Sequence, residues 1–482
     1  MDKTLKKPNI LFILCDQFRN DSMGCSGAPV RTPNLDSLAA EGVRFTNCCT
    51  VAPLCVPARI SLFTGKYPHT TTAWDNALYV MNPDGNNWLK EIRKAGYATS
   101  LVGKTHLHAD RGNLIDREEL LHRYGFDDVN EISGPHATAQ TMTHYRQMLE
   151  EKGLFEAYRA DMLSRGKKPF ARPSPLPVED YYDTYVGEHG REWLEGYTGD
   201  KPWFCHISFG GPHEPWDAPE PYASMYRPED MPAPLPEITD RNPDRPRGEY
   251  DRVFNARHMD DPAQSREIRA NYYGNITLID EEIGKIFDAV KARGEWDNTV
   301  VVFSSDHGEM NGDHGFVNKR NFFTGALNVP LIVRTPETAA AGGRVSDAFV
   351  SLLDVGATLA DYAGAPLAYE QYGISVGPIV RGEKEAIRPW VLSEYAGERM
   401  LLTDEWKMVV NSQGKPYLLF HRTDDPDECD NLAGTAEAAA TEQALLAHLL
   451  RVTCETTPVK PANTHLPWNF ERDSEAEKNC PD

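Results

Sequence analysis

Basic residues are scarce in this chain. Lysine and arginine together number 50, against 72 aspartates and glutamates, and the formal net charge is −22. Proteins that bind nucleic acid or anionic membranes need basic surfaces, which this balance does not supply. We therefore expect no nucleic acid and no membrane among the partners. A small positive pocket is still compatible with this composition, because local charge decides what a site binds.

The cysteines lack the spacing of a metal or disulfide framework. No two of the nine form a C-x-x-C pair of the zinc-site type. Their number is odd, and disulfide scaffolds belong to short secreted domains, not to a chain of 482 residues. A core of this size needs no disulfide to be stable, so we expect mostly free, reduced thiols.

Long hydrophobic runs are missing near the N-terminus. The apolar run from Ile10 to Cys15 is far shorter than the ~18 residues of a membrane span and too short for the core of a signal peptide. It predicts a strand buried on both faces instead. We expect a cytoplasmic protein, with a secreted or periplasmic one as the alternative if a leader segment precedes this sequence.

Buried strands alternate with helices over most of the chain. Apolar runs in PWFCHISF, NTVVVFSS and VPLIV predict further strands. The longest amphipathic helix begins at Arg266 and ends at Gly294, with isoleucines recurring at three- and four-residue steps. Such alternation predicts an α/β fold with a large, mostly parallel central sheet flanked by helices.

The pattern changes towards the C-terminus. After about Gly377, short strands joined by turns such as Ser412–Gly414 predict a small antiparallel sheet, closed by a helix from Glu437 to Thr453. We place a domain boundary near residue 375, giving domains at 1–375 and 376–482. Within the larger one, the proline-rich passage 215–247 predicts an irregular loop, and its Trp216 could line a specificity pocket.

Polar residues gather where the predicted strands end. Sites in parallel sheets form outside the carboxyl ends of the strands, and the residues at those ends are Asp16, Gln17, Lys104, His106, His213, Asp306 and His307. Each alone has a structural explanation, such as a helix cap. Together, the Asp16, Gln17, Asp306 and His307 side chains offer ligands for a divalent cation. Arg59, Lys104 and Lys319 could surround an anion.

One cysteine has an unusual setting. Cys55 is followed by Pro57 and Arg59 in the stretch CVPARISLFTG. Three interpretations are open from these residues: a thiolate nucleophile beside a cation, a disulfide partner, or a cysteine that is chemically modified.

Several segments, in order along nearly the whole chain, resemble the type I sulfatases of the alkaline phosphatase superfamily. They are NILFILCDQ, TPNLDSLAAEGVRF, CVPAR with LFTG, GKTH, GPHEPW, SSDHGEMNGDHG, NVPLIV and DDPDECDNLAG. The resemblance implies an alkaline phosphatase-like fold, with residues 1–375 as the catalytic domain and a smaller α+β subdomain after it. It implies a sulfatase acting on a sulfate monoester of a sugar or an aryl alcohol.

The resemblance also assigns roles to residues. A separate formylglycine-generating enzyme would read Cys55, Pro57 and Arg59 and convert Cys55 to Cα-formylglycine. One hydroxyl of the aldehyde hydrate attacks sulfur and expels the alcohol, and loss of a proton from the other releases sulfate. The divalent metal would be held by Asp16, Gln17, Asp306, His307 and the modified Cys55. Arg59 would lie beside the nucleophile. Lys104 and His106 would contact the hydrate, with His106 as the base. His213 and Lys319 would bind the sulfate, and one of them would act as the acid.

Two positions depart from the common sulfatase pattern. Many sulfatases have Asp-Asp and Asp-Asn where this chain has Asp16-Gln17 and Asp306-His307. Ca²⁺ is the first expectation, but imidazole suits transition ions better, so Mn²⁺, Mg²⁺ and Zn²⁺ are open. The glutamine also resembles the phosphonate monoester hydrolases, so a phosphonate monoester hydrolase or phosphodiesterase using the same site is the alternative function.

Other features of the sequence allow more than one interpretation. A catalytically silent binding protein is the third hypothesis, against which the intact Cys55 and its cationic neighbours argue. His108, Asp313 and His314 lie beside matched motifs, and we favour structural roles for them. The sequence also allows a homo-oligomer.

The acidic balance predicts a small or oligomeric substrate, because a long sulfated polymer would be repelled unless a basic groove compensates. We expect the protein to pass through a heparin column at neutral pH and moderate salt without retention. Strong retention that is released by salt would contradict this expectation.

Overall fold

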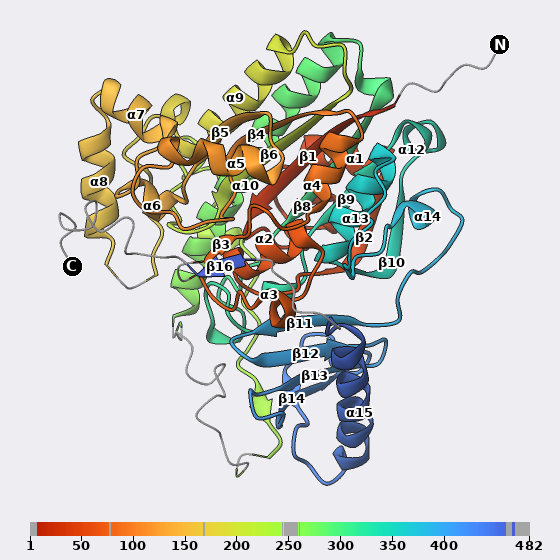
Figure 1. The fold of residues 1–482 in the computed structure, drawn as a ribbon. Coiled ribbons are helices and arrows are strands. Elements are labelled where there is room, and N and C mark those ends of the chain that lie inside the picture. The colour runs from red at the N-terminus through yellow and green to blue at the C-terminus, as the bar shows by residue number, and fades with distance from the viewer. Residues whose placement is uncertain are drawn as a thin grey trace.

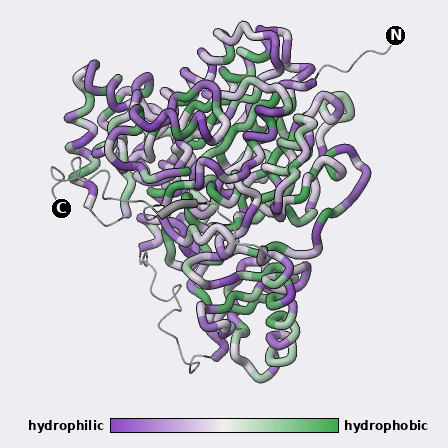
Figure 2. Tube along the Cα trace, in the orientation of Figure 1, coloured by the Kyte–Doolittle hydropathy of each residue, from purple (hydrophilic) through white to green (hydrophobic). Residues whose placement is uncertain are grey.

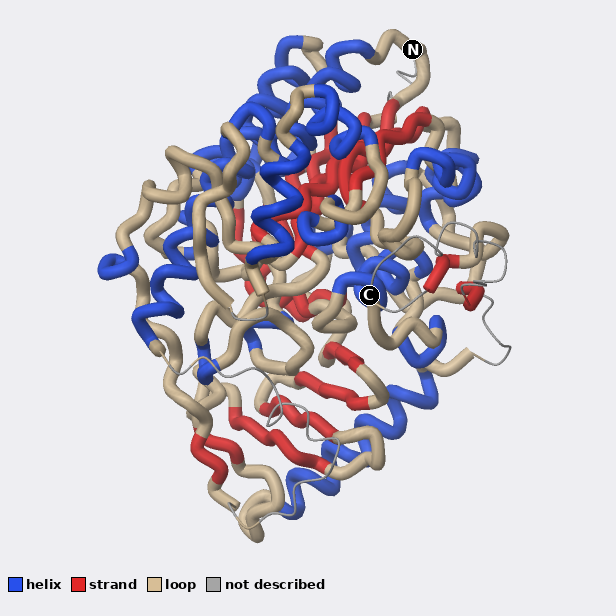
Figure 3. The backbone as a smooth tube through the Cα atoms, turned by 90° about the vertical axis from the view of Figure 1, so that its left-hand side faces the viewer, coloured by secondary structure: helices blue, strands red, loops and turns tan. Residues whose placement is uncertain are grey.

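The structure is a computed structural model that describes residues 7–76, 79–166, 169–242, 244, 259, 261–458 and 465–467. Figure 1 shows a large body built around one central sheet, with a second, smaller sheet and helix α15 beneath it. Turning the molecule by 90° separates the two sets of strands and shows helices on both sides of the larger one (Figure 3).

The central sheet has eight strands in the order β10-β2-β9-β8-β1-β6-β4-β5. Strand β9 is antiparallel to both its neighbours, and the other pairings are parallel. In chain order the strands are β1 (Asn9–Asp16), β2 (Val43–Cys49), β4 (Ala98–Lys104), β5 (Asp128–Ile132), β6 (Trp203–Pro212), β8 (Thr299–Ser305), β9 (Leu331–Arg334) and β10 (Arg344–Ser351). The predicted α/β fold with a mostly parallel sheet is confirmed.

Two hydrophobic cores cover the two faces of this sheet. Strand β1 alternates between them: Ile10, Phe12 and Leu14 face one core, while Leu11 and Ile13 face the other. Figure 2 shows the resulting apolar interior beneath more polar outer helices.

The helices divide between the two cores according to their buried residues. The first core is covered by α2 (Cys55–Thr64), α4 (Trp88–Lys94), α5 (Glu118–Tyr124), α13 (Leu352–Ala363) and α14 (Gly377–Val380). The second is covered by α1 (Pro33–Glu41), α7 (His144–Glu151), α8 (Phe155–Ser164), α9 (Tyr182–Gly196) and α10 (Pro262–Ala292). Short helices α3 (Pro68–Thr71), α6 (Pro135–Thr138), α11 (Thr324–Leu327) and α12 (Pro336–Ala341) connect these elements.

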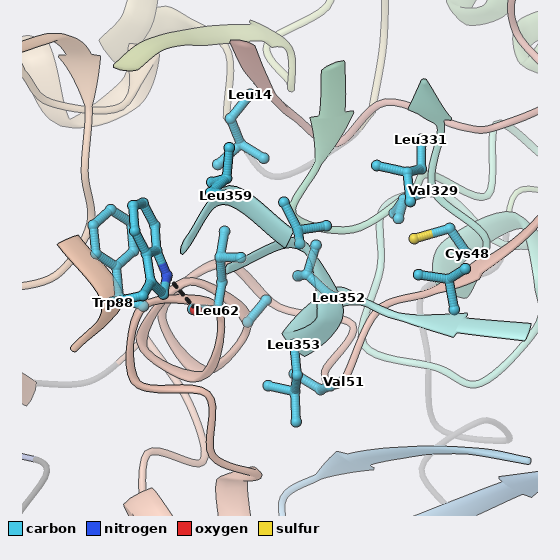
Figure 4. Close-up of a cluster of buried hydrophobic side chains, with 14 of the residues drawn as sticks. Leu14, Cys48, Val51, Leu62, Trp88, Val329, Leu331, Leu352, Leu353 and Leu359 are labelled. Atoms are coloured by element: carbon cyan, nitrogen blue, oxygen red, sulfur yellow. Dashed lines mark hydrogen bonds between the residues drawn. The ribbon is translucent and has the colours of Figure 1, made fainter. Parts of the chain in front are cut away.

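Helix α2 is fixed to its neighbours inside the first core. The Trp88 indole nitrogen donates a hydrogen bond of 2.8 Å to the carbonyl oxygen of Leu62, and both side chains belong to the same buried cluster as Leu352 and Leu359 of α13 (Figure 4). This anchoring holds the opposite, N-terminal end of α2, where Cys55 lies, against the edge of the sheet.

The C-terminal part forms the predicted antiparallel sheet. Its strands are β11 (Val391–Tyr395), β12 (Glu398–Leu402), β13 (Trp406–Val410) and β14 (Pro416–His421), with α15 (Ala439–Glu455) packed beside them. Two small pairs, β7 (Thr239–Asp240) with β15 (Asp430–Asn431) and β3 (Tyr79–Met81) with β16 (His465–Pro467), connect distant segments. The domain boundary near residue 375 stays a prediction.

The small sheet has an apolar face of its own towards the larger body. Met400, Val409 and Phe420 cluster with Phe322 and Phe323, which follow Lys319 closely in the chain. The smaller sheet therefore supports the segment that carries one of the predicted site residues.

The position of Trp216 differs from the prediction that it lines a specificity pocket. Its side chain is 4% exposed and packs in the second hydrophobic core, so it does not line an open pocket. The described part of 215–242 has little regular structure, as predicted, and the rest of that loop up to 247, apart from Asp244, lies outside the described residues.

Two further expectations can be compared with the described residues. All eight of their cysteines are free, which agrees with the expected reduced thiols. None of their helices has the length and apolar composition that crossing a bilayer requires.

Gly103 of β4 allows the sheet to close tightly at the site. Its φ is +113°, and a Cβ atom there would lie 2.0 Å from the Ser208 carbonyl oxygen of β6. We expect Gly103→Ala to lower the free energy of unfolding by about 3 kcal/mol or more, since strain and overpacking add. Gly96→Ala is the matched control: its φ is +98° but nothing lies within 4 Å, so only strain of about 1–3 kcal/mol applies. Equal losses in urea denaturation would contradict the role of the close approach.

Candidate active site

The predicted site residues converge at one edge of the central sheet. Strands β8, β1, β6 and β4 are consecutive parallel neighbours, so their carboxyl ends lie side by side. These ends carry the residues Asp16, Gln17, Lys104, His106, His213, Asp306 and His307. Helix α2 adds Cys55 and Arg59, and a loop after β8 adds Lys319. The structure thus brings together every residue to which the sequence analysis gave a catalytic or metal-binding role.

Arg59 lies at the centre of the site and is 1% exposed. Its guanidinium donates to the carboxylates of Asp306 (2.7 Å) and Asp16 (3.2 Å). The remaining donors reach the Lys104 carbonyl oxygen (2.8 Å) and the Ser208 hydroxyl (3.0 Å). Burial would lower the pKa of Arg59, but Asp306 and Asp16 outweigh it and raise that pKa. One buried cation therefore connects β1, β4, β6 and β8.

Asp16 also accepts a hydrogen bond from a second cation. The Lys104 ammonium lies 2.6 Å from its Oδ2 atom, and both side chains are almost fully buried. Burial raises the pKa of Asp16, but Lys104, His213 and Arg59 together hold it well below the usual range. The Asp16 carboxylate is therefore ionised in the site.

Four buried side chains form a cluster that could hold a metal ion. One ligand atom from each of Asp16, Cys55, Asp306 and His307 lies within 4.8 Å of all the others. The Nδ1 atom of His307 lies 3.0 Å from the Gly308 carbonyl oxygen, which can only accept a hydrogen bond. We therefore assign the proton to Nδ1, which leaves the Nε2 lone pair directed to the cluster.

The charge state of His307 also suits a cation. Burial is the main cause that lowers the pKa of His307, so the ring is neutral, as a metal-binding imidazole must be. The Cys55 Sγ lies 3.1 Å from its Nε2 atom and 3.7 Å from Asp16 Oδ1. Two carboxylates, an imidazole and this side chain fit a divalent cation.

Gln17 lies beside this cluster but its side chain has other partners. Its amide nitrogen donates to Glu214 (2.8 Å) and to Glu309, and its side-chain oxygen accepts a hydrogen bond from the Lys319 ammonium. The oxygen is thus already paired with a cation of the chain. The role of Gln17 as a metal ligand stays a prediction.

Lys319 and His213 form a polar pair next to the cluster. The Lys319 ammonium lies 2.6 Å from His213 Nε2, which is 4.0 Å from Asp16 Oδ1. Burial lowers the pKa of Lys319, but Glu214, Cys55 and Asp16 together raise it above the usual value. A protonated Lys319 and a partly exposed His213 can both contact an anion that binds here.

His106 faces the site from the turn after β4. Its backbone is left-handed, with φ at +55°, its Nε2 lies 3.5 Å from Asp110 Oδ2, and its Nδ1 has no hydrogen-bond partner in the described part of the protein. Burial and the neighbouring Lys104 and Arg59 lower its pKa well below the usual value. The ring is therefore neutral and able to accept a proton.

Sequence reasoning missed several residues of the site. Glu214 stands inside the motif GPHEPW, next to His213, but nothing in the sequence indicated that its side chain points back towards Lys319. Asn76 accepts a hydrogen bond of 3.0 Å from the backbone nitrogen of Val56, beside Cys55, and belongs to no matched motif. Glu309, in the segment SSDHGEMNG, contacts Gln17.

The residues for which we favoured structural roles have structural contacts. His108 is fully buried and lies 2.9 Å from Glu131. Asp313 accepts hydrogen bonds from Arg19 and Arg269, and His314 donates to the Pro236 carbonyl oxygen.

Comparison with known proteins places this site in a family. The chain matches the Sulfatase family model over residues 8–365 and the model "N-sulphoglucosamine sulphohydrolase, C-terminal" over residues 312–455. An arylsulfatase of Clostridium perfringens is 29% identical, over 89% of this chain and 91% of its own. An N-acetylglucosamine-6-O-sulfatase of Bacteroides thetaiotaomicron is 25% identical, over 92% and 85% of the two chains.

The solved structures agree with these relatives in fold. The phosphonate monoester hydrolase of Agrobacterium radiobacter superimposes with a TM-score of 0.75 at 26% identity, covering 93% of this chain and 96% of its own. The expected alkaline phosphatase-like fold is thereby confirmed. With the family model matching most of the chain, from before β1 to the end of α13, the protein belongs to the sulfatase family and is a sulfuric ester hydrolase.

Proposed function

We propose that the protein hydrolyses a sulfate monoester of a sugar or an aryl alcohol, with Cys55 converted to Cα-formylglycine as its nucleophile. The observation that supports this most directly is the position of Cys55. It is the first residue of α2, is fully buried, and lies among the carboxylates, imidazole and cations described above. The substrate class rests on relatives named as an arylsulfatase and as an N-acetylglucosamine-6-O-sulfatase.

Two groups outside the unmodified chain would complete this site. The aldehyde hydrate of formylglycine would supply one hydroxyl as nucleophile and a second whose deprotonation releases sulfate. A divalent ion would supply Lewis-acid polarisation of a sulfate oxygen and of the nucleophile. We propose that Asp16, Asp306, His307 and the modified Cys55 hold it, with Gln17 as a further ligand. Ca²⁺ is the ion implied by the family resemblance, while the His307 imidazole makes Mn²⁺, Mg²⁺ or Zn²⁺ alternatives.

Different residues of the chain would carry out the individual proton transfers. His106 is neutral, and its Nδ1 has no hydrogen-bond partner among the described residues, so we assign it the proton that leaves the nucleophile's second hydroxyl. Lys319, with its raised pKa, is a persistent cation for the sulfate. One of the pair, Lys319 or His213 beside it, protonates the leaving oxygen, where negative charge develops as the ester bond breaks. Lys104 and Arg59 stabilise the nucleophile and the carboxylates around it.

A phosphonate monoester hydrolase or phosphodiesterase activity is the second candidate. The observation that favours it is the likeness to the phosphonate monoester hydrolase of Agrobacterium radiobacter, together with Gln17 in the second ligand position. Sulfate monoesters, phosphonate monoesters and phosphodiesters are all tetrahedral monoanions, so one pocket can accept each of them.

The nucleophile is tested by mass spectrometry of protein produced with a formylglycine-generating enzyme. The tryptic peptide 45–59 holds Cys48, Cys49 and Cys55, so conversion of Cys55 leaves two thiols to alkylate instead of three. We expect the modified protein to hydrolyse an aryl sulfate, and Cys55→Ala to lose at least about 10³-fold in kcat/KM, the scale of losing a nucleophile.

The control for this experiment is Cys454→Ser, because Cys454 is exposed and should leave the activity unchanged. A peptide that keeps three thiols despite a competent modifying enzyme would overturn the proposed nucleophile. Comparing aryl sulfate with aryl phosphonate monoester on the modified protein then separates the two candidate functions.

The metal cluster is tested by ion content and thermal stability, without any turnover. We expect the protein to bind one divalent ion and to melt at a higher temperature with it, because the ion binds the folded state. Asp306→Asn should weaken binding by roughly 100-fold or more, since even residues behind metal ligands contribute 10–100-fold. Asp288→Asn, on the exposed face of α10, is the matched control. Equal ion binding in both variants would contradict the assignment.

A further inference from the structure

Glu214 places a carboxylate beside the groups that we propose hold the sulfate. Its Oε2 atom lies 3.5 Å from the Lys319 ammonium and 3.3 Å from His213 Nδ1. Within the described part of the chain, it is the only carboxylate at ion-pair distance from Lys319. The side chain is 22% exposed, so this negative charge is partly accessible to solvent beside Lys319.

Neighbouring amides hold the Glu214 carboxylate in place. Gln17 donates to its Oε2 atom at 2.8 Å. Asn318, in the amide orientation that satisfies both of its polar atoms, donates to both carboxylate oxygens at 2.8 and 2.9 Å. The Lys319 ammonium on the other side favours the ionised form of this carboxylate. The residue is a fixed anion and not a mobile surface side chain.

A fixed anion next to the binding cation acts on substrates according to their charge. Coulomb repulsion is proportional to the charge of the ligand, so Glu214 disfavours a dianion about twice as strongly as a monoanion. Sulfate monoesters, phosphonate monoesters and phosphodiesters carry one negative charge. Phosphate monoesters have the same tetrahedral shape but approach two charges at neutral pH, because their second pKa is about 6.

We propose that Glu214 restricts the site to singly charged tetrahedral esters by offsetting the positive charge of Lys319 where the substrate binds. This inference rests on the proposed function and deepens it, because it names the charge class of the substrate. It makes Glu214 a specificity-determining residue that excludes phosphate monoesters, which shape alone would not exclude.

The test is a ratio of two specificity constants measured on the same preparation. With metal-loaded protein carrying the modified Cys55, kcat/KM is determined for 4-nitrophenyl sulfate and 4-nitrophenyl phosphate. We expect Glu214→Gln to shift the ratio towards the phosphate by roughly tenfold or more, while Glu214→Asp, which keeps the charge, shifts it less. The fraction of active protein cancels in the ratio, so partial misfolding does not imitate the effect.

Glu220→Gln is the matched control. Glu220 lies six residues further along the same segment, is exposed, and contacts Ser224, and its substitution changes the net charge of the protein equally. An unchanged ratio in Glu214→Gln, with both rates reduced together, would show a purely structural role and overturn the proposal. A shift of equal size in Glu220→Gln would also overturn it, because the effect would then come from net charge.

A binding measurement keeps the inference testable if neither ester is turned over. Benzenesulfonate and phenylphosphonate have similar shapes and are not hydrolysed, and at mildly alkaline pH they carry one and two negative charges. We expect Glu214→Gln to gain affinity for phenylphosphonate relative to benzenesulfonate in calorimetric titrations. An unchanged affinity ratio overturns the role of Glu214, whereas absence of sulfatase turnover with a shifted affinity ratio overturns only the proposed reaction.

Discussion

The buried guanidinium of Arg59 is the interaction on which the rest of the site depends. It connects two carboxylates, Asp16 and Asp306, that end neighbouring strands and would otherwise repel each other in a medium of low dielectric constant. Its remaining donors hold the Lys104 carbonyl oxygen and the Ser208 hydroxyl. A buried cation with four hydrogen bonds to four different strands or strand ends fixes them in one geometry. Because Arg59 lies one turn of α2 after Cys55, it also fixes the candidate nucleophile relative to these strands.

The parallel sheet explains why segments so distant in the sequence meet at this place. Strands β8, β1, β6 and β4 are neighbours and run in the same direction, so the residues that follow each of them emerge at the same edge. The Lys319 segment reaches this edge differently. Phe322 and Phe323 anchor it against the small C-terminal sheet, so that sheet contributes to the site without supplying a residue to it.

Charges in the site are arranged in pairs around a neutral base. Lys104 pairs with Asp16, Arg59 with Asp16 and Asp306, and Lys319 with Glu214. His106 stays neutral among them because burial and the nearby cations lower its pKa. A monoanionic ester that binds here contacts cations whose positive charge is already partly offset by these carboxylates. The amide of Gln17 contacts both members of the Lys319–Glu214 pair.

The sequence alone determined the α/β fold, the positions of four of the eight strands of the central sheet and the list of candidate residues. Strands and helices could be predicted because apolar runs and helical periodicity reflect which side chains are buried. The polar strand ends indicated a site because the carboxyl ends of parallel strands share an edge. The Cys55–Arg59 motif was recognised from its own residues. It did not determine that Trp216 is buried, that a helix begins at Cys55 itself, or that the Gln17 side chain contacts Lys319. Those outcomes depend on contacts between side chains that lie hundreds of residues apart, such as Gln17 with Lys319. Only the packed tertiary structure decides which of several hydrogen-bond partners a buried polar group finds.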